Sequence, residues 1–195
     1  MRRTQVERSE ATRSALVAAA RELFAARGFA AVGTEEIVRR AGVTRGALYH
    51  HFAGKRDLFR ACYEQIESEL AERLVESVAP GAGALETLRA GKELFLDATL
   101  DPEMQRIALI DAPAVLGWEQ WREIGARYGL GLIEALLAAG MESGEIRRQP
   151  LRPLAHAMLG ALDEVAMLVS RAEDPRAARA EASETLESLI LGLEA

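Results

Sequence analysis

A pair of short predicted helices that meet at a glycine, within residues 34–52, constrains the fold of this chain more than any other feature. The first helix covers about residues 35–41, and Gly42 then supplies the positive φ that a tight turn between helices needs. Thr44 is placed to cap the second helix through its hydroxyl. The second helix combines small residues with cationic and aromatic hydrogen-bonding residues: Arg45, Gly46, Ala47, Tyr49 and His50. This pattern predicts a helix-turn-helix whose second helix contacts DNA.

The same pattern is compatible with an ordinary helical protein, because its apolar residues would be core in either case: Ile37, Ala41, Val43, Leu48 and Phe52. The charge distribution favours DNA binding. Residues 1–60 contain 12 Lys and Arg against 6 Asp and Glu, a net charge of +6. Residues 61–195 contain 12 against 24, a net charge of −12, which gives −6 for the whole chain. A basic N-terminal part joined to an acidic remainder is typical of a DNA-binding domain attached to a second domain.

The rest of the sequence predicts an all-α fold. Ala, Leu, Glu and Arg dominate, and no run of β-branched residues is long enough for a strand. Apolar periodicity and Gly or Pro breaks predict nine helices. We expect a polar, basic tail over residues 1–10, a first helix over 11–27 that ends at Gly28, and Phe29 folded back onto the core.

The clearest domain boundary is the turn-forming segment 80–83, Pro-Gly-Ala-Gly, with four predicted helices before it and five after. We therefore expect residues 1–55 to form a helix-turn-helix domain and residues 80–195 to form a larger helical domain. A long helix over residues 55–78 would connect the two.

Several protein classes lack support in the sequence. Charges interrupt the apolar stretches, so no signal peptide or membrane span is expected and the predicted compartment is the cytoplasm. The single cysteine, Cys62, excludes an intramolecular disulfide and a cysteine-rich zinc site, and it is expected to be an apolar filler rather than a reactive thiol. No nucleophile–base pattern, metal-ligand spacing or phosphate-binding loop is evident, so no catalytic residue, metal or cofactor is predicted. An enzyme or ligand carrier is the alternative class, with His156 expected to be a packed or surface residue.

The helix-turn-helix resembles the signature of the tetracycline-repressor-like (TetR/AcrR) transcriptional regulators over about residues 11–60. The matching residues are Thr34, Ile37, Ala41, Gly42, Val43, Thr44, Gly46, Leu48, Tyr49, His51, Phe52, Lys55 and Leu58. Val38 departs from the family pattern, which often has alanine there. The resemblance implies a homodimer with a three-helix DNA-binding head and a helical domain for ligand binding and dimerisation. It implies most directly a repressor that a small molecule releases from a pseudo-palindromic operator, although an activator or an effector-free DNA binder uses the same head.

The resemblance also implies roles for residues of the head. Thr34 and Thr44 would hold phosphates at helix N-termini. Three side chains would donate to phosphates: Tyr49, His51 and Lys55. The first turn of the second helix would face base edges in the major groove through Arg45, Gly46 and Ala47, with the arginine suited to guanine and the alanine to a thymine methyl. His50 would touch a base or a phosphate; alternatively, His50 and His51 are a solvated polar pair.

The last two predicted helices carry apolar stripes that would form a two-fold four-helix bundle with a partner protomer. The stripe residues are Leu159, Leu162, Ala166, Leu186, Leu189, Ile190 and Leu193. The competing interpretation is that these residues belong to the core of one protomer.

A ligand cavity in the second domain is expected to use bulky and adaptable residues. The candidates are Phe95, Met104, Trp118, Trp121, Tyr128, Met158, Asp163 and Met167. Asp111 and Asp163 stand in apolar sequence, and we expect them to be helix-end or interface groups rather than ligand contacts. If either lines the cavity, a cationic or hydroxylated ligand is indicated.

Overall fold

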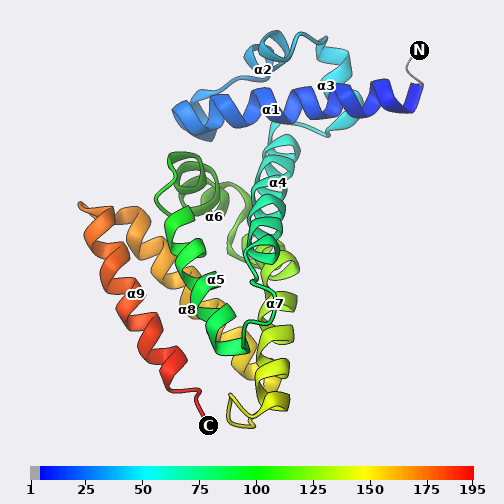
Figure 1. The fold of residues 1–195 in the computed structure, drawn as a ribbon. Helices are drawn as coiled ribbons and strands as arrows, with labels where there is room; N and C mark the ends of the chain where they lie inside the picture. Colours follow the sequence, from blue (N-terminus) through cyan, green and yellow to red (C-terminus); the bar gives the residue numbers. More distant parts are fainter. Residues whose placement is uncertain (1–4) are drawn as a thin grey trace. The chain divides into compact units, whose positions relative to one another are not determined.

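The computed structural model describes residues 5–195, and helices account for its regular structure. Over these residues it contains nine α-helices and one π-helix (Figure 1). No strand is present in this part of the chain, where extended pairing is limited to an isolated bridge between Ile146 and Glu194. The predicted all-α fold is confirmed. Between α5 (Ala84–Ala98) and α7 (Trp118–Ser143) lie a π-helix, η1 (Met104–Asp111), and directly after it a short α-helix, α6 (Ala112–Leu116).

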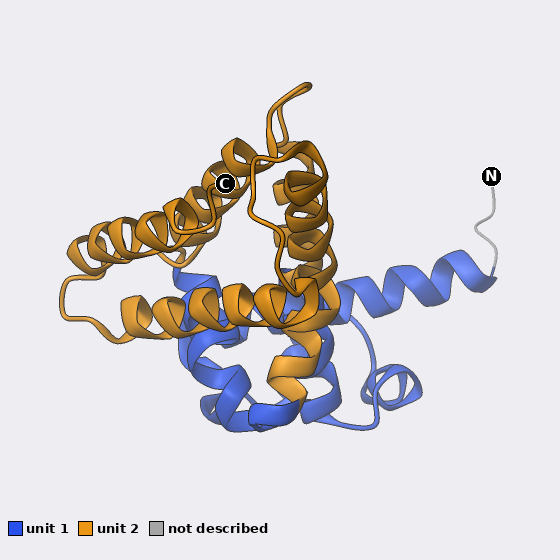
Figure 2. Cartoon of the chain, turned by 90° about the horizontal axis from the view of Figure 1, so that it is seen from below, with its two compact units in different colours: residues 1–66, 102–119 blue, residues 67–101, 120–195 orange. Residues whose placement is uncertain are grey.

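The chain folds into two compact units (Figure 2). Unit 1 consists of residues up to 66 together with residues 102–119, and unit 2 consists of residues 67–101 and 120–195. Besides η1 and α6, unit 1 contains α1 (Gln5–Ala31), α2 (Thr34–Ala41), α3 (Arg45–His51) and the first half of α4 (Lys55–Glu76). Unit 2 contains the rest of α4, α5 (Ala84–Ala98), nearly all of α7 (Trp118–Ser143), α8 (Leu151–Arg171) and α9 (Pro175–Leu191).

The first helix begins earlier than expected. Residues 5–10, which we assigned to a polar tail, are helical and continue into α1, whereas residues 1–4 of that tail lie outside the described residues. The segment contains neither Gly nor Pro, and Glu7 lies in the first turn, where a negative charge favours the helix dipole. The Thr12 hydroxyl donates to the Arg8 carbonyl at 2.9 Å within the same stretch.

Gly28 interrupts α1 with φ 77° and ψ 163°, as the predicted helix stop requires. The chain then turns Phe29 back onto the core, where its ring lies 5.7 Å from that of Phe24 and 5.2 Å from that of Phe59. The backbone N–H of Phe29, freed by the break, donates to the Asp111 carboxylate at 2.6 Å. Asp111 is thus a helix-end group, as expected, and it ties η1 to α1.

Two further polar contacts hold residues 102–119 in unit 1. Arg21 of α1 forms an ion pair with Glu103 at 2.8 Å. Arg56 of α4 donates to the carbonyls of Val115 and Leu116 at 3.0 and 2.9 Å, which satisfies backbone acceptors at the C-terminal end of α6. This segment follows α5 in the sequence and precedes most of α7, yet it packs with the helix-turn-helix. The predicted division at residue 80 therefore differs from the observed units.

Unit 2 is held by apolar clusters and by an ionic network between α5 and α9. Lys92, whose side chain is buried, contacts Glu93 at 2.9 Å and Glu187 at 2.8 Å. Arg179 of α9 contacts Glu93 at 2.5 Å, and the Ser183 hydroxyl donates to the same carboxylate at 2.6 Å. Burial alone would raise the pKa of Glu93, but these hydrogen bonds outweigh burial and lower its pKa to about 2.

The predicted dimer face is wrong for most of its residues. Five of the seven are buried within unit 2 of a single protomer and have no area to offer a partner: Leu159, Ala166, Leu186, Ile190 and Leu193. Leu162 packs against both apolar clusters of this unit. Leu189 alone of the set is largely exposed. The stripes serve the contacts of α8 and α9 with each other and with α5, which was the competing interpretation.

Two helices, α7 and α8, are more apolar than the sequence analysis allowed. Each contains an 18-residue window with at most two charged residues and a mean hydropathy of 1.2, which is sufficient in length and composition to cross a membrane. This is weak evidence for a span, because core helices have the same composition. Both helices contribute residues to the core of unit 2, among them Leu137 and Ala155.

The Asp111 contact gives a stability prediction for unit 1. Asp111→Ala leaves the Phe29 N–H without its acceptor in a place where the Asp111 side chain is only 14 % exposed, so the free energy of unfolding should fall by about 1–3 kcal/mol. Urea unfolding followed by circular dichroism measures this loss. Glu119→Ala, which removes an exposed carboxylate of the same unit, is the control and should change stability by less than about 0.5 kcal/mol. Equal losses in both variants would contradict the assigned role.

Acid should weaken unit 2 through Glu93. Because the pKa of Glu93 falls from 4.5 to about 2 on folding, its ionised form stabilises the protein above pH 4.5, and this contribution is lost as the pH falls toward 2. Glu93→Gln removes the titrating group. The difference in Tm between the wild type and Glu93→Gln should therefore shrink as the pH is lowered from about 6 to about 2.5. A difference that stays constant, as expected for the exposed control Glu184→Gln, would count against the network.

Candidate nucleic-acid interface

The turn between α2 and α3 is fixed by one glycine and one threonine. Gly42 adopts φ 68° and ψ 28°, and its N–H donates to the Arg39 carbonyl at 3.3 Å while the N–H of Val43 donates to the Val38 carbonyl at 3.0 Å. The Thr44 side chain accepts a hydrogen bond from the Ala47 N–H at 3.2 Å and so caps α3. The hinge and the cap are as the sequence predicts.

This turn divides the helix-turn-helix into a buried and an exposed face. Ile37, Leu48 and Phe52 are buried on the side where α2 and α3 pack against α1 and each other. On α3, Arg45, Gly46, Tyr49 and His50 are exposed, whereas Ala47 is half-buried and Leu48 is buried. Thr34 is half-buried at the first position of α2, and Thr44 is exposed. The structure therefore brings most of the predicted DNA-contacting residues onto one surface.

Two contacts orient the exposed arginine. Its guanidinium lies 3.5 Å from the Glu35 carboxylate of α2, and its Cζ atom lies 5.6 Å from the centre of the Tyr49 ring. The arginine is at the first position of α3, so its side chain projects from the N-terminal end of the helix that the motif places in the major groove.

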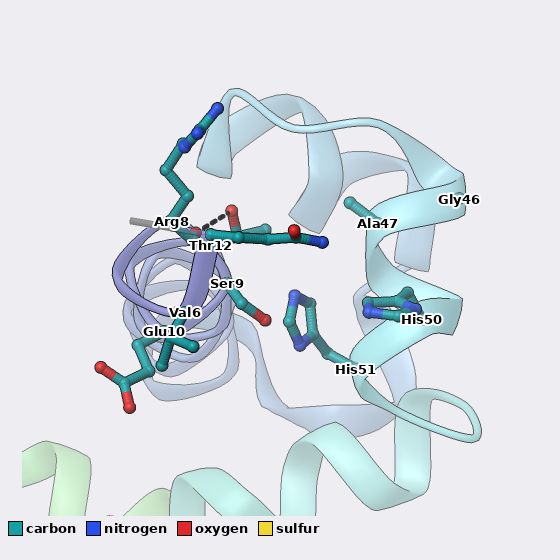
Figure 3. Close-up of a pocket in the computed structure, with 10 residues that line it drawn as sticks. Val6, Arg8, Ser9, Glu10, Thr12, Gly46, Ala47, His50 and His51 are labelled. Atoms are coloured by element: carbon teal, nitrogen blue, oxygen red, sulfur yellow. Dashed lines mark hydrogen bonds between the residues drawn. The ribbon is translucent and has the colours of Figure 1, made fainter. Parts of the chain in front are cut away.

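His51 points from α3 toward α1 and is half-buried (Figure 3). Burial lowers the pKa of His51, and the neighbouring charges of His50 and Arg13 lower it further. The ring is therefore neutral at pH 7 and keeps one N–H that can donate to a phosphate oxygen. Its ring lies 5.1 Å from that of His50, which stays on the exposed face.

A groove of about 770 Å³ lies between the first turns of α1 and α3 (Figure 3). Its lining residues come from both helices: Gln5, Val6, Arg8, Ser9, Glu10 and Thr12 from α1, and Gly46, Ala47, His50 and His51 from α3. We expected residues 1–10 to be a polar tail, so the helical face that residues 5–10 present beside α3 was not predicted. The signal was present, since Gln5, Arg8, Ser9 and Thr12 have the i, i+3, i+4, i+7 spacing of one helix face.

The ammonium group of Lys55 is engaged by other groups of the protein, unlike that of a lysine that is free to bind a phosphate. Its ammonium group donates to the carbonyls of Phe29 and Val32 at 2.7 and 2.8 Å and lies 4.0 Å from the centre of the Phe29 ring. Partial burial lowers the pKa of Lys55. These contacts tie the start of α4 to the chain segment between α1 and α2. Lys55 therefore has a structural role that the sequence did not indicate.

The residues predicted to line a ligand pocket are divided between the two units. Met104 and Trp118 belong to unit 1, and Trp118 is 56 % exposed. The other six lie in unit 2: Phe95, Trp121, Tyr128, Met158, Asp163 and Met167. Met158 is part of an apolar cluster of this unit, and Phe95 packs against another.

Asp163 of α8 forms an ion pair with Arg122 of α7 inside unit 2. Burial raises the pKa of Asp163 to about 6, in spite of the opposing effect of the Arg122 charge. Asp163 is thus an interhelical group rather than a solvent-exposed one, as the sequence analysis expected. Cys62 is buried, and burial raises the pKa of its thiol, which makes it a core residue in the described structure. Among residues 5–195, no cluster of three or more His, Cys, Asp or Glu side chains is arranged to hold a metal ion.

Comparison with known proteins agrees with this architecture in both parts of the chain. Residues 16–62 match the family model described as "Bacterial regulatory proteins, tetR family". Residues 85–193, more than half of the chain, match "Tetracyclin repressor-like, C-terminal domain". The Transposon Tn10 TetC protein of Escherichia coli is 31 % identical over 147 residues, which cover 73 % of this chain and 72 % of that protein.

Two further relatives connect the sequence and the fold. The transcriptional repressor BepR of Brucella suis is 48 % identical over 61 residues, 31 % of this chain and 29 % of BepR. The crystal structure of a TetR-family regulator from Pectobacterium atrosepticum superposes with a TM-score of 0.85 at 35 % identity and covers 98 % of both chains. The chain therefore belongs to the TetR family, and it is a transcriptional regulator with an N-terminal helix-turn-helix rather than an enzyme.

Proposed function

We propose that the protein is a homodimeric repressor in the cytoplasm that binds a pseudo-palindromic operator and is released from it by a small molecule. The observation that carries the DNA-binding part is the exposed first turn of α3, held in place by the Gly42 turn and the Thr44 cap. In a dimer, two such helices enter major grooves one helical turn apart, at about 34–36 Å. The operator is then two half-sites with the symmetry of the protein.

Within each half-site, the contacts divide into those that position and those that read. We propose that Thr34, Thr44, Tyr49 and His51 contact phosphates, with the groove residues Arg8 and Ser9 of α1 as additions. Gly46 allows close approach of the backbone, and three side chains contact bases: Arg45, Ala47 and His50. Lys55 contacts phosphate only if one N–H of its ammonium remains available beside its two carbonyl partners.

For the dimer interface we propose a different face of α8 and α9 from the buried stripes. Each of the two helices exposes a large apolar side chain: Leu168 of α8 is 56 % exposed and Leu189 of α9 is 47 % exposed. Exposed leucines at the surface of two long adjacent helices are suited to burial against the same helices of a partner protomer. Such an interface is isologous about a two-fold axis.

Effector release requires a ligand that stabilises a conformation with low affinity for DNA. The contacts of residues 102–119 support a route for this effect. The segment is joined through the chain to α5 on one side and α7 on the other, and both helices belong to unit 2. Within unit 1 it is fixed to α1 and α4 through Asp111, Glu103 and Arg56. A ligand that shifts α5 or α7 therefore also displaces residues 102–119, which are hydrogen-bonded to α1 and α4.

The relatives of this chain include both a repressor and an activator. BepR of Brucella suis is named a repressor, and FasR of Mycolicibacterium smegmatis, 35 % identical over 85 residues, is named an activator. Their shared helix-turn-helix does not distinguish the two modes. A reporter driven by the bound promoter in a deletion strain tests the proposal: expression should rise when the gene is removed, and a fall would identify an activator.

The proposed contacts predict two different effects on DNA binding. A duplex is first selected from a random double-stranded library with the wild-type protein, and Kd is measured over a salt series. Arg45→Ala should lose about 1–3 kcal/mol of discrimination at one base pair per half-site, whereas Arg8→Ala should weaken all duplexes equally and reduce the salt slope by about one per half-site. Indifference of Kd to both substitutions and to salt would contradict the interface.

The proposed dimer face predicts a change in oligomeric state. The double variant Leu168→Glu/Leu189→Glu places two charges per protomer in the interface and should shift the protein from dimer to monomer in sedimentation experiments at micromolar concentration. Val75→Glu, at an exposed apolar residue of α4, is the matched control and should leave the dimer intact. A double variant that remains dimeric would move the interface elsewhere.

A further inference from the structure

Glu35 connects the two helices of the helix-turn-helix at the residue proposed to read a base. Its carboxylate lies 3.5 Å from the Arg45 guanidinium, across the turn between α2 and α3. The same guanidinium lies over the Tyr49 ring, one helical turn further along α3, at 5.6 Å. Arg45 is therefore bounded by a carboxylate from one helix and an aromatic ring from its own.

Two other acidic side chains close to α2 pair with arginines outside α3. Glu36, the neighbour of Glu35, pairs with Arg27 of α1. Glu22 of α1 pairs with Arg40 of α2 at 2.5 Å. Glu35, by contrast, pairs with Arg45, the first residue of α3. The pairing is a feature of this position and not of the general excess of arginine in unit 1.

The fold itself gains little from this ion pair. The side chains of Arg45 and Glu35 are 63 % and 80 % exposed, and an exposed pair contributes about 0–1 kcal/mol. A carboxylate on a DNA-facing surface also opposes the phosphate charge and so weakens binding to DNA of any sequence. Glu35 thus weakens non-specific binding to DNA and contributes little to the stability of the fold. A role in base recognition accounts for its presence at this position.

We propose that Glu35 is a positioning residue that determines base specificity through Arg45. The inference rests on the proposed role of α3 as the DNA-reading helix. The Glu35 carboxylate attracts the Nη1 end of the guanidinium, and the Tyr49 ring lies against its face. The other edge then presents two parallel N–H donors in the orientation that the O6 and N7 atoms of guanine require.

Docking on DNA strengthens this arrangement. Removal of water from around Arg45 raises the attraction between the two charged groups, because the local dielectric constant falls. An arginine held on one side has fewer alternative partners among phosphates and neighbouring bases. Glu35 therefore lowers affinity for DNA in general while it raises the preference for one guanine, and these two effects have opposite signs when Glu35 is removed.

The experiment compares Glu35→Gln with Glu36→Gln, which makes the same charge change one residue away. Kd is measured by fluorescence anisotropy for the duplex selected by the wild type, for each single base-pair substitution of it, and for a scrambled duplex. Glu35→Gln should bind the scrambled duplex about 2- to 5-fold more tightly and lose about 5- to 10-fold of discrimination at the guanine read by Arg45. Glu36→Gln should bind all duplexes more tightly and keep the discrimination.

Two further variants separate charge from position. Glu35→Asp keeps the charge but shortens the side chain by one methylene group, so it should lose discrimination without any gain on the scrambled duplex. In an Arg45→Ala background, Glu35→Gln should change nothing at that base pair, since the two residues act as a unit.

Two results would overturn the inference. One is an equal change of Kd on all duplexes for Glu35→Gln, which is the behaviour of a solvated charge. The other is a change of preference at a different base pair, which means that Glu35 contacts a base of its own. Failure of the wild type to select any sequence would instead refute DNA reading by α3. Selection that Arg45→Ala relaxes and Glu35→Gln does not would refute only the role of Glu35.

Discussion

The left-handed turn at Gly42 is the constraint on which the recognition surface depends. With φ 68° and hydrogen bonds from residues 42 and 43 back into α2, it sets the direction in which α3 leaves α2. Burial of Leu48 then fixes the rotation of α3 about its own axis, so that Arg45 and Tyr49 face outward. A β-carbon at residue 42 would strain this backbone conformation and change the angle between the helices. The positions of the exposed residues are therefore set by the backbone conformation at Gly42 and by the burial of Leu48, and not by the exposed residues themselves.

Unit 1 also includes residues 102–119, a segment that is distant in sequence from the other helices of the unit. Asp111 accepts the N–H that the Gly28 break leaves free, and Arg56 donates to the carbonyls that end α6. Each contact satisfies a backbone group at a helix end or break, where helices leave such groups without partners. The helix-turn-helix thus depends for its support on residues 102–119, whose flanking helices lie in unit 2. The chain itself therefore links residues 102–119 of unit 1 to two helices of unit 2.

The sequence predicted the elements that local chemistry determines. Gly42, the Thr44 cap, the Gly28 stop and the return of Phe29 to the core each follow from one or two neighbouring residues. Partners that are distant in sequence could not be predicted in this way. The stripe that includes Leu186 and Ile190 was assigned to a dimer face because apolar periodicity reports that a face is buried but not against what. Lys55 bonds to carbonyls more than twenty residues earlier, and the charge pattern gave no sign of this.

The central claim is that Arg45 reads a guanine in each half-site of a two-fold operator. Methylation interference on the selected duplex tests it most directly, because a methyl group on guanine N7 blocks bidentate contact with arginine in the major groove. The account predicts one critical guanine per half-site, with the two about one helical turn apart, for the wild type, and no interference at those guanines for Arg45→Ala. Interference that is absent, or that persists unchanged in Arg45→Ala, would contradict it.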